Sequence, residues 1–156
     1  MPEVPAYTRL RLTPELHSKI NNALADSHPL VLAVVDESGQ PHLSFRGSLQ
    51  TYSDTQLGFW LRNPQGSTLP SIRRNPKVAL IYRSASTPLL QFHGHARIAI
   101  DDAERERVFG AAPEVERKAD PDRKGVAIII DLTRIEGVLG LGPNGPVWCR
   151  MAAELT

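Results

Sequence analysis

Short runs of β-branched and aromatic residues, separated by turn-forming residues, recur along this chain and limit the folds that it can adopt. The first run, 30–35, reads Leu-Val-Leu-Ala-Val-Val, and the segment 36–41 that follows contains a glycine and a proline that fit a hairpin loop. We expect the chain to return along 42–50. Further strands are expected at 57–62, 78–82, 89–100, 125–139 and 147–150. Strands at hairpin spacing indicate an antiparallel sheet.

Three short helical regions accompany the strands. The segment 13–26 opens with an N-cap threonine and a proline at the first helical position, and its apolar residues then recur at helical spacing. A second helix is expected over 68–74, because Pro76 stops it. A third is expected over 101–109, with a restart at 113–118. The expected fold class is α+β, an antiparallel barrel of six or seven strands with short helices at its ends.

The composition limits the partners and the compartment that are expected. A chain of 156 residues, 41% hydrophobic, is the size of a single domain, in which 1–12 would form an extended N-terminal arm. The lone Cys149 cannot form an internal disulfide, which favours the cytoplasm. A net charge of +1 with well-mixed charges argues against nucleic-acid binding. No run approaches the ~18 apolar residues of a membrane span, so neither insertion nor secretion is expected.

The expected second strand, 42–50, carries polar side chains in an unusual pattern. Ser44, Arg46, Ser48 and Gln50 alternate along it, so a strand would place all four on one face. A polar face of this kind can simply face solvent. Gly47, however, lies inside the expected strand, where a glycine commonly marks a bulge or a close approach of a ligand to the backbone. These residues therefore make a candidate ligand-binding strand.

A second candidate lies where the next strand ends. Arg62 is followed by a loop with Gly66, and Ser67 and Thr68 then open the expected helix. Hydroxyls and backbone N–H groups at a helix start, beside a guanidinium, can bind a phosphate, although ordinary helix caps look the same. Because two consecutive strands can bring Arg46 and Arg62 together, we expect one anion site.

Two later strands also carry polar or aromatic side chains at alternate positions. His93 and His95 share a face with Gln91, but no third ligand has suitable spacing, so no metal site is predicted. A polar strand face, or one that borders a cofactor, is favoured instead. Trp148 and Arg150 likewise share a face, either as a core ring with a solvated cation or as part of a site.

Taken in order, these segments resemble the FMN-binding split-barrel superfamily related to pyridoxamine 5'-phosphate oxidase. The likeness rests on the opening helix and on the segments 32–42, 46–50, 72–80 and 91–96. The resemblance implies a homodimeric split β-barrel that holds flavin in two clefts at the dimer interface. It also implies roles for the candidate residues. The phosphate would be bound by Arg46, Arg62, Ser67 and Thr68, and the strand Arg46-Gly47-Ser48 would face the cofactor. Hydrogen bonds to the flavin ring would come from Gln50, from Gln91 or, across the dimer interface, from Arg150 of the partner subunit. Trp148 would cover the ring.

The resemblance also implies a function, with departures that narrow it. It favours an FMN-dependent oxidoreductase that transfers hydride between a reduced nicotinamide-type donor and a small organic acceptor. A reductase using deazaflavin (coenzyme F420) and a non-catalytic flavin- or haem-binding protein are the alternatives. Authentic pyridoxamine-phosphate oxidases have one lysine at the position of Gln50 and a second in a Ser-Arg-Lys helix start, where this chain has Gly66-Ser67-Thr68. Their basic C-terminal ending is also absent, so a divergent member with another substrate is expected.

Overall fold

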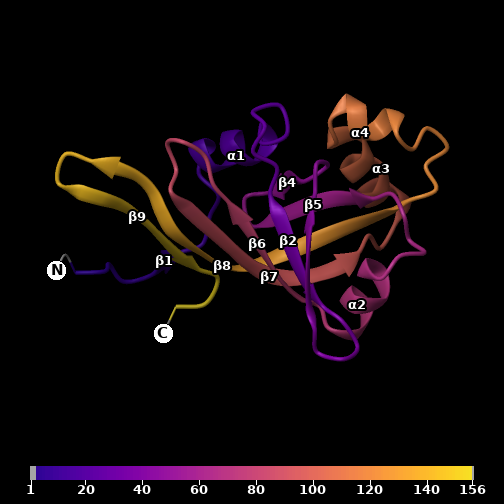
Figure 1. Cartoon of the computed structure of the whole chain (residues 1–156), viewed down its shortest axis with the longest axis horizontal. Helices are drawn as coiled ribbons and strands as arrows, with labels where there is room; N and C mark the ends of the chain where they lie inside the picture. Colours follow the sequence, from indigo (N-terminus) through magenta and orange to yellow (C-terminus); the bar gives the residue numbers. More distant parts are fainter. Residues whose placement is uncertain (1–2, 156) are drawn as a thin grey trace.

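The computed structural model describes residues 3–155 and shows a mixed α+β fold built on one mostly antiparallel sheet (Figure 1). The strands are β1 (Thr8–Arg9), β2 (Val31–Val35), β3 (Pro41–Phe45), β4 (Gln50–Ser53), β5 (Gln56–Leu61), β6 (Lys77–Tyr82), β7 (Leu89–Ile98), β8 (Val126–Gly142) and β9 (Gly145–Ala152). The helices are α1 (Pro14–Asn21), α2 (Thr68–Arg74), α3 (Asp102–Ala111) and α4 (Glu114–Lys118). None of the helices within residues 3–155 is long and apolar enough to cross a membrane.

The sheet order is β1-β9-β8-β7-β6-β2-β3, with β5 pairing to β8 and β4 to β5. The 17-residue β8 has three partners, because β7 pairs along one of its edges, while β5 pairs with the first part of the other edge and β9 with the second part. The β8–β9 hairpin therefore extends beyond the helices to one side in Figure 1. The expected six or seven strands were too few for this nine-stranded sheet, since β1 adds a parallel pair to β9 and the expected strand 42–50 is divided. Barrel closure stays a prediction.

One face of the sheet forms the core. Leu32, Leu80, Phe92 and Ile135 stand opposite one another on four neighbouring strands, and all four are buried. Burying an aliphatic or aromatic side chain of this kind stabilises the fold by about 1.5–3 kcal/mol. The apolar stripe of α1 packs against the same cluster, which explains why its period-3.6 pattern was readable in the sequence. Helix α1 ends at Asn21 rather than near Asp26, and turns follow it.

The other face of the sheet leaves large apolar side chains in the open. Leu43 and Phe45 on the edge strand β3 are 74% and 72% exposed, and Ile81 on β6 is 42% exposed. Cross-strand pairing continues the row from Phe45 through Val31 and Ile81 to polar residues on β7, β8 and β9. Exposed apolar side chains gathered on one face are typical of an interaction surface.

The single cysteine is part of the packing. Cys149 on β9 is buried, and burial raises the pKa of its thiol. A buried thiol with a raised pKa is mostly protonated and therefore a poor nucleophile. Cys149 acts as an apolar filler of the core.

An ion pair attaches α3 to β7. Both guanidinium Nη atoms of Arg97 donate to Glu104, each over 2.9 Å, and the Ile100 N–H donates to the same carboxylate. The Arg97 bonds, aided by Ile100, lower the pKa of Glu104 from its ordinary 4.5 to about 2. This carboxylate therefore stabilises the fold fully above pH 4.5, and its contribution is lost as the pH falls towards 2.

We expect Glu104→Gln to lower the free energy of unfolding at pH 7 by about 1.5–3 kcal/mol, the usual worth of hydrogen bonds to a charged group. The variant should also lose part of the acid dependence of stability between pH 4.5 and about 2. Denaturant unfolding measured across that pH range checks both expectations. Glu114→Gln is the matched control, because Glu114 is exposed and pairs with Lys118 within one helix. Equal stability of the Glu104→Gln variant and the parent at pH 7 would contradict this account.

Candidate functional site

A pocket of about 650 Å³ lies between the β3–β4 connection and the loop that follows β5. Its size falls within the range of about 300–1,000 Å³ that is common for small-molecule sites. Six of the ten candidate residues line it: Arg46, Gly47, Ser48, Arg62, Ser67 and Thr68. The two sequence segments that were expected to form one anion site therefore do come together.

The segment Arg46-Gly47-Ser48 is a turn, so its expected place on a strand was wrong. Strand β3 ends at Phe45, the Arg46 N–H donates to the carbonyl of Leu30, and the Leu49 N–H turns back to the Arg46 carbonyl over 3.3 Å. The alternating polar residues therefore have a different origin from a polar strand face. Ser44 lies on β3, Arg46 and Ser48 belong to the turn, and Gln50 begins β4.

The hydroxyl of Ser48 attaches this turn to β5. Ser48 is 3% exposed, its Oγ accepts from the Trp60 N–H at 2.9 Å, and it donates to the Trp60 carbonyl at 3.1 Å. The Ser48 hydroxyl thus makes the two hydrogen bonds to the Trp60 backbone that a residue of a neighbouring strand would make. Because its single hydrogen is already donated, Ser48 positions the turn beside the pocket and is not a free donor for a ligand.

Arg46 supplies the main cation of the pocket. One Nη donates to the Thr68 hydroxyl at 2.9 Å, and the guanidinium lies 5.4 Å from the centre of the Phe59 ring. Its Nε is buried without a hydrogen-bond partner among the described residues. Burial and the neighbouring Arg62 lower the pKa of Arg46, against the opposing effect of Glu116. A guanidinium held in this way has an unused donor and an incompletely balanced charge, and an anionic ligand would satisfy both.

The second cation and the hydroxyls come from the far side of the pocket. Arg62 follows directly after β5, and Ser67 and Thr68 begin α2, whose bounds match the expected 68–74. Ser67 makes no side-chain capping bond within the described structure, so its hydroxyl is available to the pocket. Sequence reasoning missed Glu116 of α4, which also lines the pocket and pairs with Arg62. Nothing in the sequence distinguishes this carboxylate from the other acidic residues of its helix.

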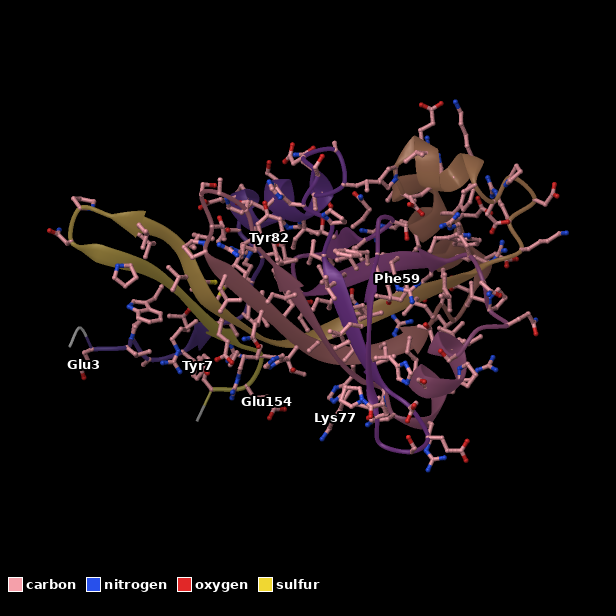
Figure 2. The ribbon with its side chains drawn as sticks, viewed as in Figure 1. Glu3, Tyr7, Phe59, Lys77, Tyr82 and Glu154 are labelled. Atoms are coloured by element: carbon pink, nitrogen blue, oxygen red, sulfur yellow. The ribbon has the colours of Figure 1, made fainter. Side chains whose placement is uncertain are left out.

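The other four candidate residues lie elsewhere. Gln50 begins β4 and lines a separate pocket of about 400 Å³ beneath α4. Gln91 lies on β7, on the same open sheet face as Arg150 and Trp148 of β9. Arg150 and the Arg46 pocket lie at opposite sides of the molecule in Figure 2. Tyr7, which packs against Arg150, is beside the β8–β9 hairpin, whereas Phe59, which packs against Arg46, is across the molecule.

Comparison with known protein families identifies the class of protein that this fold and pocket represent. Residues 16–138 match the family model described as pyridoxamine 5'-phosphate oxidase. The chain belongs to this family. The match runs from within α1 through most of β8 and includes both sides of the pocket. A comparison with curated proteins gave no match.

Solved structures share the fold. HupZ of Group A Streptococcus is 25% identical, with a TM-score of 0.59 over 79% of this chain and 90% of HupZ. General stress protein 26 from Bacillus anthracis is 20% identical, with a TM-score of 0.59 over 88% of this chain and 99% of that protein. An FMN-binding protein from Syntrophomonas wolfei is 12% identical, with a TM-score of 0.56 over 78% of this chain and 84% of that one.

Proposed function

We propose that this protein binds FMN in the pocket beside Arg46 and works as a flavin-dependent oxidoreductase. The observation that carries the proposal is the buried, unpartnered Nε of Arg46 in a pocket that also holds Arg62 and two hydroxyls. Membership of the pyridoxamine 5'-phosphate oxidase family supports a flavin ligand. So does the fold shared with a protein named as FMN-binding.

The residues of the pocket fit the phosphate end of FMN. Arg46 and Arg62 would provide charge, and Ser67 and Thr68 would provide hydroxyl donors. The Arg46–Thr68 bond orients the guanidinium within the pocket. A preoriented cation of this kind reduces the side-chain entropy that is lost on binding.

The ring end of the flavin would need a second copy of the chain. Phe45, at the pocket, and Arg150 stand in one row across the sheet, separated by five strand-to-strand steps, or about 24 Å at ~4.8 Å per step. Arg150, which lies against Tyr7, is therefore on a part of the sheet well away from the pocket of its own chain, as the separation of Tyr7 and Phe59 in Figure 2 also shows. We infer a split-barrel homodimer in which the exposed sheet faces pack together, with Trp148 and Arg150 of the partner subunit at the flavin ring.

The bound flavin would supply the redox chemistry, by accepting or giving hydride. The chain's own residues would bind its phosphate, and Gln91 or Arg150 of the partner subunit would donate hydrogen bonds to the ring edge. A reduced nicotinamide-type donor and a small organic acceptor are the proposed substrates. The single buried cysteine accords with a cytoplasmic setting.

The absorption spectrum of the purified protein tests the proposed cofactor. We expect bands near ~450 nm, after purification or after incubation with FMN, because the bound cofactor dominates the visible spectrum. A band near ~420 nm would instead indicate coenzyme F420, and a sharp Soret band would indicate haem. A protein that stays colourless after incubation with each cofactor would refute the proposal.

A further inference from the structure

A carboxylate lies inside the proposed phosphate pocket. Glu116 belongs to α4, its side chain is only 19% exposed, and its Oε2 lies 3.7 Å from Nε of Arg62. Its other oxygen lies against Gly47, where an added Cβ would be 2.6 Å from Oε1. The glycine of the turn therefore leaves room for this carboxylate, and Glu116 spans the pocket from the turn to Arg62.

The carboxylate changes the charge that a ligand meets. Among the described residues that line the pocket, Arg46, Arg62 and Glu116 are the charged ones, so the formal sum is +1 rather than +2. Glu116 also acts on Arg46, since it opposes the lowering of that guanidinium's pKa. A phosphate that enters this pocket meets one negative charge as well as two positive ones, which weakens its binding.

Glu116 is held by α4, which is a short and exposed helix. The helix has no buried residue, and Arg117 attaches it by donating to the carbonyls of Gly110 and Ala112 over 3.0 and 2.8 Å. The carboxylate end is a flexible group against a glycine, so it can be displaced with little strain. The Glu116 carboxylate is therefore an anion of the protein itself that pairs with Arg62 and that the phosphate of a ligand can replace.

We propose that Glu116 sets the phosphate affinity of the pocket by competing with the ligand's phosphate for Arg62. The inference rests on the proposed flavin site and assigns to it a selectivity residue. It predicts that the pocket binds phosphate groups less tightly than its two arginines alone would. Glu116 acts here through Arg62 and the local charge.

The test compares FMN with riboflavin, which has the same ring without the phosphate. We expect Glu116→Gln to bind FMN at least about ten-fold more tightly than the parent, because the competing charge is removed while the side chain keeps its size. Riboflavin affinity should be unchanged. Glu114→Gln, two residues earlier on the same helix, is the matched control and should leave both affinities unchanged. Fluorescence titration measures all of these constants, and thermal unfolding shows whether each variant is folded.

The outcomes separate this inference from the proposed function. Equal tightening for riboflavin, or no tightening for FMN, would overturn the role of Glu116. If neither the parent nor the variants bind any flavin, the proposed function fails, and titration with inorganic phosphate then decides the inference. Tighter phosphate binding by Glu116→Gln would support it, and unchanged phosphate binding would overturn it.

Discussion

Replacing Leu43 by aspartate is expected to convert the proposed homodimer into a monomer. Leu43 is 74% exposed on the edge strand β3, beside Phe45 on the open face of the sheet. An unpaired carboxylate that is buried in an apolar interface costs at least about 2 kcal/mol, in addition to the apolar contacts that are lost. The dimer dissociation constant should therefore rise by at least about thirty-fold.

Sedimentation equilibrium over a range of protein concentrations measures this effect. Ile100→Asp is the matched control, because Ile100 is also exposed and apolar but lies between β7 and α3, away from the open face. The Leu43→Asp variant should in addition lose affinity for the flavin ring, since Trp148 and Arg150 of the partner subunit would no longer contribute. A parent protein that sediments as a monomer at all concentrations would rule out the shared site.

Local signals in the sequence were enough to predict several elements. The bounds of α2 match the expected 68–74. The proline that ends the helix follows directly after Asn75, so the helix and its stop signal are neighbours in the sequence. The strands β2, β5 and β6 were also found, since their apolar runs are bounded by turn residues. Elements fixed by neighbouring residues can be read from the sequence in this way.

The turn at Arg46-Gly47-Ser48 could not be read in this way. Its polar residues alternate as they would on a strand, and the hydroxyl that holds the turn finds its partner at Trp60, on the next strand. The reason for Gly47 is more distant still, because the side chain that occupies the space beside it belongs to Glu116. Trp60 and Glu116 lie far from the turn in the sequence, so these contacts can be identified only once β5 and α4 are packed against it.

The position of Trp148 and Arg150 depends on the order of strands in the sheet. Period two placed the two side chains on one face, and the pairing of β9 with β8 confirms this. Their distance from the pocket, however, follows from the order β9-β8-β7-β6-β2-β3. Sequence spacing does not determine that order, so the need for a second chain is an inference from the fold.

Replacing Arg46 by alanine is expected to weaken FMN binding by ~1.5–3 kcal/mol, the usual worth of a hydrogen bond to a charged group. The loss should be confined to ligands with a phosphate, so riboflavin affinity should change little. The fold should tolerate the change, because the substitution removes a buried Nε that has no partner among the described residues and one bond to Thr68. Fluorescence titration of both flavins measures the difference directly.

Two further variants define the role of the Arg46 guanidinium. Arg46→Lys keeps the charge but lacks the planar fork, so its FMN affinity should fall between those of the parent and Arg46→Ala. Arg73→Ala removes an exposed cation from the last turn of α2, outside the pocket, and should leave FMN affinity nearly unchanged. Because the three variants differ in charge, geometry and position, a loss in Arg46→Ala and a smaller loss in Arg46→Lys, with none in Arg73→Ala, would indicate a specific contact. An equal loss in Arg73→Ala would instead show that only the general positive charge of this region attracts the flavin.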